Sequence, residues 1–133
     1  MGIFDGLKNA FQPGGLHQKW MIPQSEEDLI YLFEDGSGTH LIYKHSFACG
    51  ICLFSKRRIE GMMDDSPQIS GWHFIDVRKH RNLSVFVANR SEVRHESPQA
   101  ILFHNGRVLW HGSHSMVQPE VITNALQNLK SSD

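Results

Sequence analysis

The chain has 133 residues, of which 40% are hydrophobic and 20% are charged, and its formal net charge is −1. This length suits one domain, and the composition excludes a chain that is disordered throughout. The balanced charge also argues against a protein dedicated to nucleic acid, which would carry an excess of basic residues.

Residues 1–24 are predicted to be a lead-in segment, in which apolar residues at helical spacing give way to Pro13-Gly14-Gly15. Ser25 then suits a helix N-cap, with Asp28 at the position of the acid in a capping box. The apolar face of this short helix is formed by Leu29, Ile30, Leu32 and Phe33. We therefore expect a lead-in over 1–24 and one folded domain over 25–133.

Four strands and three further helices are predicted downstream. The strands cover residues 39–43, 72–77, 100–103 and 108–110, with a polar turn over 64–71 and a hairpin at Asn105-Gly106. The helices start near Cys49, near Leu83 and at Pro119, since proline suits the first helical position. Helices between strands imply parallel crossovers. The sequence thus predicts an α/β three-layer sandwich, a central mixed four-stranded sheet flanked by helices.

The chain has two cysteines, Cys49 and Cys52, at C-x-x-C spacing. One such pair is a poor framework for a secreted domain and suits a redox pair in a cytoplasmic one. At a helix start, Cys49 would face unpaired backbone N–H groups and the positive end of the helix dipole, which favour the thiolate. Cys52 would lie one turn deeper and be less acidic. We therefore expect Cys49 to attack and Cys52 to resolve the mixed disulfide.

Residues near the pair could tune it or bind substrate. Lys44 and His45 lie directly upstream, and His95 is expected at the same surface, although a plain surface histidine is the simpler interpretation of each ring. Ser97-Pro98 precedes the third predicted strand. A cis-proline there would leave the Ser97 backbone free to pair with an incoming peptide, whereas a strand-entry proline is the alternative.

A metal site or two structural cysteines are the alternative uses of the C-x-x-C pair. Two histidines would complete a Cys2His2 zinc site, and an iron–sulfur cluster shared by a dimer is a variant. The candidate histidines are His45, His95, His111 and His114. Trp110 and His114 are otherwise expected at the far hairpin, where packing is their simplest role.

Four stretches of sequence carry a family resemblance: Tyr43-Lys44-His45-Ser46 before Cys49, residues 76–81, residues 95–101, and Val108-Leu109-Trp110 with Ser113-His114. Together with the C-x-x-C pair they resemble the thioredoxin fold, and more closely the bacillithiol-system family of monothiol bacilliredoxin-like proteins. The similarity covers about residues 25–130. In that family the residue matching Cys49 is the redox-active thiol, and the one matching Pro98 is a cis-proline.

The resemblance implies a thiol–disulfide oxidoreductase that removes bacillithiol from mixed disulfides on proteins. Its partners would be S-thiolated or disulfide-containing client proteins and a low-molecular-weight thiol or separate reductase. Bacillithiol would be the thiol co-substrate, and no tightly bound cofactor is expected, because the chain lacks a G-x-G-x-x-G motif after a strand. Gram-positive members usually lack a cysteine at the position of Cys52, so this chain adds a second thiol and makes dithiol chemistry possible.

A general thioredoxin-like reductase of protein disulfides is the alternative enzyme. Ala48, Ile51 and Tyr43 all differ from thioredoxins, Tyr43 standing where they keep a buried carboxylate. The basic cluster Arg78, Lys79 and Arg81 is either a solvated helix start or a contact for an anion such as a bacillithiol carboxylate. No apolar run approaches the roughly 20 residues that span a bilayer, and no targeting signal is recognised. We therefore expect a cytoplasmic protein that binds neither membrane nor nucleic acid.

Overall fold

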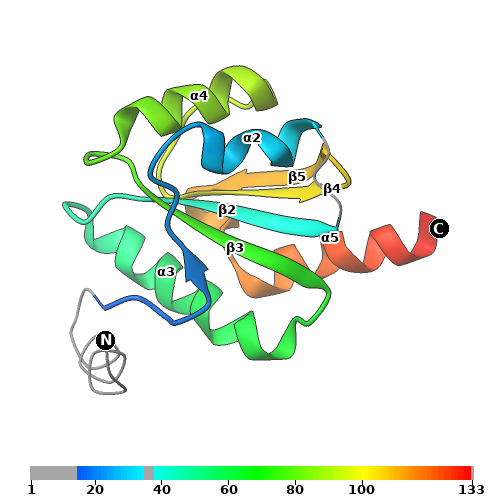
Figure 1. The fold of residues 1–133 in the computed structure, drawn as a ribbon. Helices are drawn as coiled ribbons and strands as arrows, with labels where there is room; N and C mark the ends of the chain where they lie inside the picture. The colour runs from blue at the N-terminus through cyan, green and yellow to red at the C-terminus, as the bar shows by residue number, and fades with distance from the viewer. Residues whose placement is uncertain (1–14, 35–37, 133) are drawn as a thin grey trace.

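One mixed sheet of five strands, in the order β1-β3-β2-β4-β5, forms the centre of the protein (Figure 1). The structure, a computed structural model, describes residues 15–34 and 38–132, so the helical spacing expected within residues 1–14 lies outside the described residues. The strands are β1 (Trp20–Met21), β2 (Thr39–His45), β3 (Ile69–Asp76), β4 (Gln99–His104) and β5 (Arg107–Ser113). The helices are α2 (Glu27–Glu34), α3 (Gly50–Met62), α4 (Arg81–Ser91) and α5 (Pro119–Ser132), with 3-10 turns η1 (Met63–Asp65) and η2 (His114–Met116).

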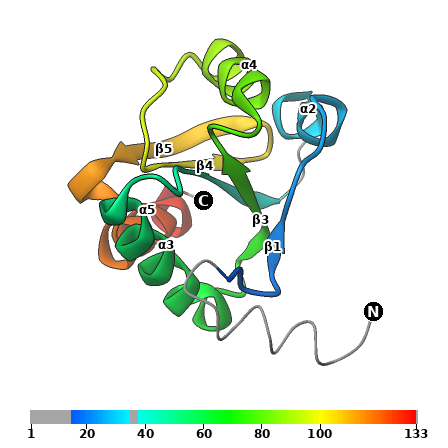
Figure 2. The ribbon, with the colours of Figure 1, turned by 90° about the vertical axis from the view of Figure 1, so that its left-hand side faces the viewer.

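The helices cover both faces of the sheet, α2 and α4 on one and α3 and α5 on the other (Figures 1 and 2). This confirms the predicted three-layer α/β sandwich. None of the helices in the described part of the chain is long and apolar enough to cross a membrane.

The predicted strand count was one too low. Trp20–Met21 runs parallel to β3, with Trp20 opposite Trp72, and adds an edge strand from the segment expected to be a lead-in. Two residues are too few to show the alternation that marks a strand. Long-range packing holds them there, because the Trp20 ring stacks on Tyr43 at 5.8 Å and meets Phe74 edge-on at 5.3 Å. The strand β3 also begins at Ile69, inside the predicted polar turn.

Local signals set several element boundaries. The Asp28 carboxylate accepts the Ser25 N–H at 3.2 Å, as a capping box requires. Asn105 and Gly106 adopt positive φ angles of 49° and 84° between β4 and β5, which is the conformation of a two-residue type I′ hairpin turn. Pro119 is the first residue of α5, as predicted.

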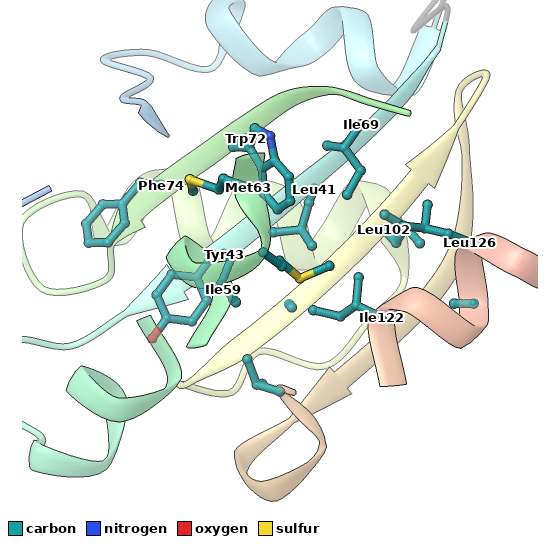
Figure 3. Packing of buried hydrophobic residues seen from close by; sticks show 14 of the residues in the cluster. Leu41, Tyr43, Ile59, Met63, Ile69, Trp72, Phe74, Leu102, Ile122 and Leu126 are labelled. Carbon is teal, nitrogen blue, oxygen red and sulfur yellow. The ribbon is translucent and has the colours of Figure 1, made fainter. Parts of the chain in front are cut away.

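Alternating residues of β2 point into two separate apolar clusters. Leu41 and Tyr43 belong to the cluster under α3 and α5, whereas Ile42 belongs to the one under α2 and α4. Figure 3 shows Tyr43 beside Ile59 at the end of the first cluster, with its hydroxyl pointing away from the centre. The side-chain period of two in a strand therefore assigns each β2 residue to one layer.

The register brings three chain segments together at one end of the sheet. β2 and β3 are parallel, with His45 opposite Asp76, and β2 and β4 are antiparallel, with Lys44 opposite Gln99. The connections from β2 to α3 and from β3 to α4 consequently lie at the same end, on the left in Figure 1. The amino end of β4 joins them there. This is the end of a sheet at which α/β proteins bind their ligands.

Candidate active site

Cys49 is the N-cap residue of α3. Its backbone is extended, with φ −115° and ψ 120°, and the helix begins at Gly50. The backbone N–H groups of Cys52 and Ile51 lie near its sulfur and lower the pKa of the thiol, although neither makes a full capping hydrogen bond. Partial desolvation of the thiol raises its pKa, whereas a hydrogen bond with the Cys52 side chain lowers the pKa further. The net effect is a pKa below that of an ordinary thiol, because orphan N–H groups stabilise the thiolate.

Cys52 is fully buried on the next turn of the same helix. Burial raises the pKa of its thiol, the Ser46 N–H opposes this, and the neighbouring Cys49 sulfur adds to the rise. Both cysteines are free thiols in the structure. The pair therefore combines an accessible, acidic thiol at the helix start with a buried, less acidic one behind it, as nucleophile and resolving residue would require.

Tyr43 and His45 lie beneath the cysteines on the α3 side of the sheet. The Tyr43 hydroxyl donates to the Cys52 carbonyl at 2.9 Å and lies 3.0 Å from His45 Nδ1. The Tyr43 hydroxyl has one proton, which it donates to the Cys52 carbonyl. In the hydrogen bond between Tyr43 and His45, His45 Nδ1 is therefore the donor. Burial, followed by the charge of Lys56, lowers the His45 pKa to about 4. His45 is thus neutral near pH 7 and helps to anchor the C-x-x-C turn to β2.

Lys44 and His95 lie on the opposite face of the sheet, under α4. Lys44 is fully buried, with its Nζ 3.2 Å from His95 Nδ1. Burial lowers the Lys44 pKa to about 8, and burial together with Lys44 and Arg81 lowers the pKa of His95. The structure therefore divides the three predicted tuning residues, placing His45 with the cysteines and pairing Lys44 with His95 on the far side.

The Ser97–Pro98 peptide bond is cis and directly precedes β4. The Pro98 carbonyl accepts the His114 N–H at 2.9 Å, and His114 Nδ1 lies 3.7 Å from a Glu96 carboxylate oxygen. The antiparallel return of β5, with Ser113 opposite Gln99, brings His114 to this end of the sheet. Our expectation that His114 lies at the far hairpin was wrong. The seven residues of β5 run from the Asn105-Gly106 turn along the whole length of β4, so the residue after β5 lies at the opposite end of the sheet.

The described residues contain no group of three or more His, Cys, Asp and Glu side chains able to hold a metal ion. The four candidate histidines and both cysteines are all within the described part of the chain. The Cys2His2 set is therefore not assembled in this structure.

A buried ion pair on α3 was not predicted from the sequence. Lys56 Nζ lies 3.2 Å from Glu60 Oε2 in a mostly buried site and also donates to the Gly15 carbonyl. Glu60 Oε2 accepts the Trp20 indole N–H at 2.7 Å. The i,i+4 spacing of Lys56 and Glu60 was the available signal. This pair ties the segment before α2 to the helix that carries the cysteines.

Three large apolar side chains near Cys49 in the chain are exposed at the surface. Phe47, Ile51 and Phe54 are 49%, 66% and 60% exposed. Phe47 sits before the cysteine and packs on His45 with a ring-centroid distance of 4.4 Å, while Ile51 and Phe54 lie on the first turns of α3. Exposed large apolar residues mark candidate protein-docking surfaces, and these three flank the cysteine in the chain.

Comparison with known proteins agrees with this geometry. A family model described as monothiol bacilliredoxin BrxC matches residues 23–122. A solved structure described as having a thioredoxin fold is similar, with a TM-score of 0.73 and 22% identity over 81% of this chain and 94% of that one. Thioredoxin O2 from Arabidopsis thaliana has a TM-score of 0.66 and 18% identity over 84% and 94%. Thioredoxin from Trypanosoma brucei brucei has a TM-score of 0.65 and 14% identity over 84% and 90%.

Proposed function

The chain belongs to the monothiol bacilliredoxin family, and from that premise we propose that it removes bacillithiol from S-bacillithiolated proteins. The thioredoxin fold and the family support thiol–disulfide redox activity. The observation that carries the finer proposal is the contrast between the two thiols. The pKa of Cys49 is lowered at the helix start, and burial raises that of Cys52.

In the first step the Cys49 thiolate attacks the bacillithiol sulfur of the client mixed disulfide. The bond between the client sulfur and bacillithiol breaks, a Cys49–bacillithiol disulfide forms, and the client thiolate leaves and takes a proton from water. Cys49 is the attacking group because a low-pKa thiol is largely thiolate at neutral pH, and attack on the bacillithiol sulfur is required for the client to leave with its own thiolate.

In the second step Cys52 gives up its proton and attacks the Cys49 sulfur. The Cys49–Cys52 disulfide forms and bacillithiol leaves as its thiolate, so two electrons pass from the enzyme to the client. Burial raises the pKa of Cys52, and the Cys49 sulfur adds to the rise; the contribution from the Cys49 charge ends once Cys49 is in the mixed disulfide. Two electrons from a low-molecular-weight thiol or a separate reductase restore the dithiol, which suits a cytoplasmic protein.

We propose that Ser97 and Pro98 line the place where the client peptide docks. No backbone hydrogen bond among the described residues uses Ser97, so its N–H and C=O remain available to an extended peptide. Pro98 is held in place by the His114 N–H on its carbonyl. The exposed Phe47, Ile51 and Phe54 would border the same surface.

Two cysteine variants and a bacillithiolated client test these roles. Cys52→Ser should release the client and accumulate an enzyme adduct heavier by one bacillithiol, whereas Cys49→Ser should do neither. Mass spectrometry of the intact enzyme reads both outcomes. An adduct on Cys49→Ser, or none on Cys52→Ser while the client is still released, would contradict the assignment.

General reduction of protein disulfides is the second candidate function. The exposed side chains of Phe47, Ile51 and Phe54 favour it, because exposed apolar groups can hold many different clients. Rates on a bacillithiolated client and on insulin disulfides separate the two functions. Equal or faster insulin reduction would favour the general reductase.

A further inference from the structure

Lys44 is fully buried under α4, and no step of the proposed reaction uses it. No carboxylate among the described residues forms an ion pair with it. Its Nζ lies 3.2 Å from His95 Nδ1. A buried ammonium group is costly unless it is hydrogen-bonded, and it can only donate. His95 Nδ1 is therefore the acceptor, which leaves the proton of the neutral ring on Nε2.

Gln99 lies directly opposite Lys44 on β4, so the two side chains share one face of the sheet. The Gln99 Nε2 donates to the Arg94 carbonyl at 2.8 Å and to the Ser113 hydroxyl at 3.2 Å. Its Oε1 is buried and has no hydrogen-bond partner among the described residues. An amide oxygen accepts hydrogen bonds, and the Lys44 ammonium has two protons beyond the one used on His95. The two neighbours therefore have complementary hydrogen-bonding groups.

Residues 94–98, between α4 and β4, depend on these two side chains for their position. The segment makes one backbone–backbone hydrogen bond to another described residue, the one from the His114 N–H. Its first two residues are held by the buried side chains of Gln99 and Lys44. It enters β4 at the same end of the sheet at which α3 begins. Side chains, and not a strand ladder, thus fix the segment in which we place client docking.

The charged groups around the contact keep His95 an acceptor at neutral pH. Burial lowers the pKa of His95 first, and the positive charges of Lys44 on β2 and Arg81 on α4 lower it further. Glu96 in the same segment raises it, and Glu96 also faces His114 after β5 at 3.7 Å. Burial alone lowers the pKa of Lys44, to about 8. Near pH 7 a charged amine therefore donates to a neutral ring.

We propose that Lys44 is a positioning residue, which acts through His95 to hold residues 94–98 in the conformation that docks the client peptide. This inference rests on the proposed function. Without the contact the segment has to be ordered when the client binds, so docking becomes weaker. The chemistry at Cys49 does not involve Lys44, which lies on the other face of the sheet. The loss should therefore appear in KM for a protein client and much less in kcat.

The contact itself is tested on the full chain with ¹⁵N-labelled histidine rings. At pH 7 the ring of His95 should be neutral, with its proton on Nε2. Lys44→Met should let this ring exchange between its two tautomers. The His104 ring, which meets the Thr39 hydroxyl at 3.0 Å, is the control and should keep its signals if the fold is intact. A proton on His95 Nδ1 in the wild type would overturn the proposal.

Kinetics then test the effect on docking. Lys44→Met and His95→Leu should each raise KM for a protein client about tenfold, as expected for a lost hydrogen bond to a charged group. His95→Asn places an amide oxygen near the position of Nδ1 and should restore most of the wild-type KM. Because His95 is exposed, its two variants keep the test valid if Lys44→Met fails to fold. Lys79→Met is the matched control, since it removes an exposed lysine from the connection between β3 and α4.

The pH dependence gives a readout that a purely structural role would not move. The wild-type KM for the protein client should rise above about pH 8, because the Lys44 amine then loses the charge that strengthens its hydrogen bond. This rise should be absent in Lys44→Met. A KM that depends on pH equally in both proteins would overturn the proposal.

Other results would also contradict it. An unchanged KM in His95→Leu, or an equal rise for the protein client and for bis(2-hydroxyethyl) disulfide, would show that the contact does not serve peptide docking. A shifted pH midpoint of Cys49 alkylation in His95→Leu would assign the contact to the thiol instead. A wild-type enzyme that fails on the bacillithiolated client but reduces insulin would overturn the proposed function alone, and KM would then be compared on insulin. Inactivity on both substrates would overturn both proposals.

Discussion

Tyr43→Phe removes one hydroxyl beneath the cysteine pair and leaves the rest of the side chain in place. The ring would keep its stacking on Trp20 at 5.8 Å and its contact with Phe74 at 5.9 Å. Two hydrogen bonds would be lost, the one to the Cys52 carbonyl at 2.9 Å and the one from His45 Nδ1 at 3.0 Å. Any change therefore reports on the hydroxyl alone.

The magnitude follows from the burial of the partners. Each neutral hydrogen bond contributes about 1 kcal/mol, and a buried group left without a partner costs about 1–3 kcal/mol. His45 is 1% exposed, so water cannot replace the lost partner of its Nδ1. The Cys52 carbonyl lies within α3 and keeps its helical bond. We expect the free energy of unfolding to fall by about 2–4 kcal/mol, and Tm by about 8–16 °C for a chain of this length.

Urea unfolding followed by circular dichroism measures this loss. Tyr31→Phe is the matched control, because Tyr31 is 37% exposed and its hydroxyl makes no hydrogen bond to another described residue. That variant should stay within about 0.5 kcal/mol of the wild type. If Tyr43→Phe is as stable as Tyr31→Phe, the Tyr43 hydroxyl does not anchor the C-x-x-C turn.

Three further predictions concern acid stability, thiol reactivity and client binding. Burial lowers the pKa values of His45 and His73 to about 4, so the unfolded chain binds more protons between its ordinary histidine pKa of about 6.5 and pH 4. The free energy of unfolding should be highest above pH 6.5 and should decrease as the pH falls from 6.5 to 4. Equal urea midpoints at pH 7 and pH 4.5 would contradict this. Alkylation of Cys49 by iodoacetamide should have a pH midpoint below that of a free cysteine peptide, and a midpoint at or above it would refute the lowered pKa. Ile51→Ser and Phe54→Ser should raise KM several-fold more for a protein client than for a small disulfide, whereas equal changes would argue against docking on these side chains.

Much of the fold could be predicted from local patterns. The capping residues around Ser25, the Asn105-Gly106 turn and Pro119 act on their neighbours, so their effect is visible in a few consecutive residues. The same holds for Cys49, whose position at a helix start follows from the change from strand to helix periodicity. The likeness to a known family came from a few short stretches, among them residues 95–101.

Other features of the fold and the site depend on contacts between residues far apart in the sequence, so only the tertiary structure shows them. Strand β1 is too short to have a pattern, and long-range contacts of Trp20 with Tyr43, Phe74 and Glu60 place it. The register of β5 brings His114 to Pro98, which no local signal reveals, because register depends on pairing between distant residues. The alternation of β2 puts His45 with the cysteines and Lys44 under α4 with His95. Adjacent residues of a strand point to opposite faces of the sheet, so Lys44 and His45 lie on different faces. Which side chains they meet there depends on the helices packed on each face.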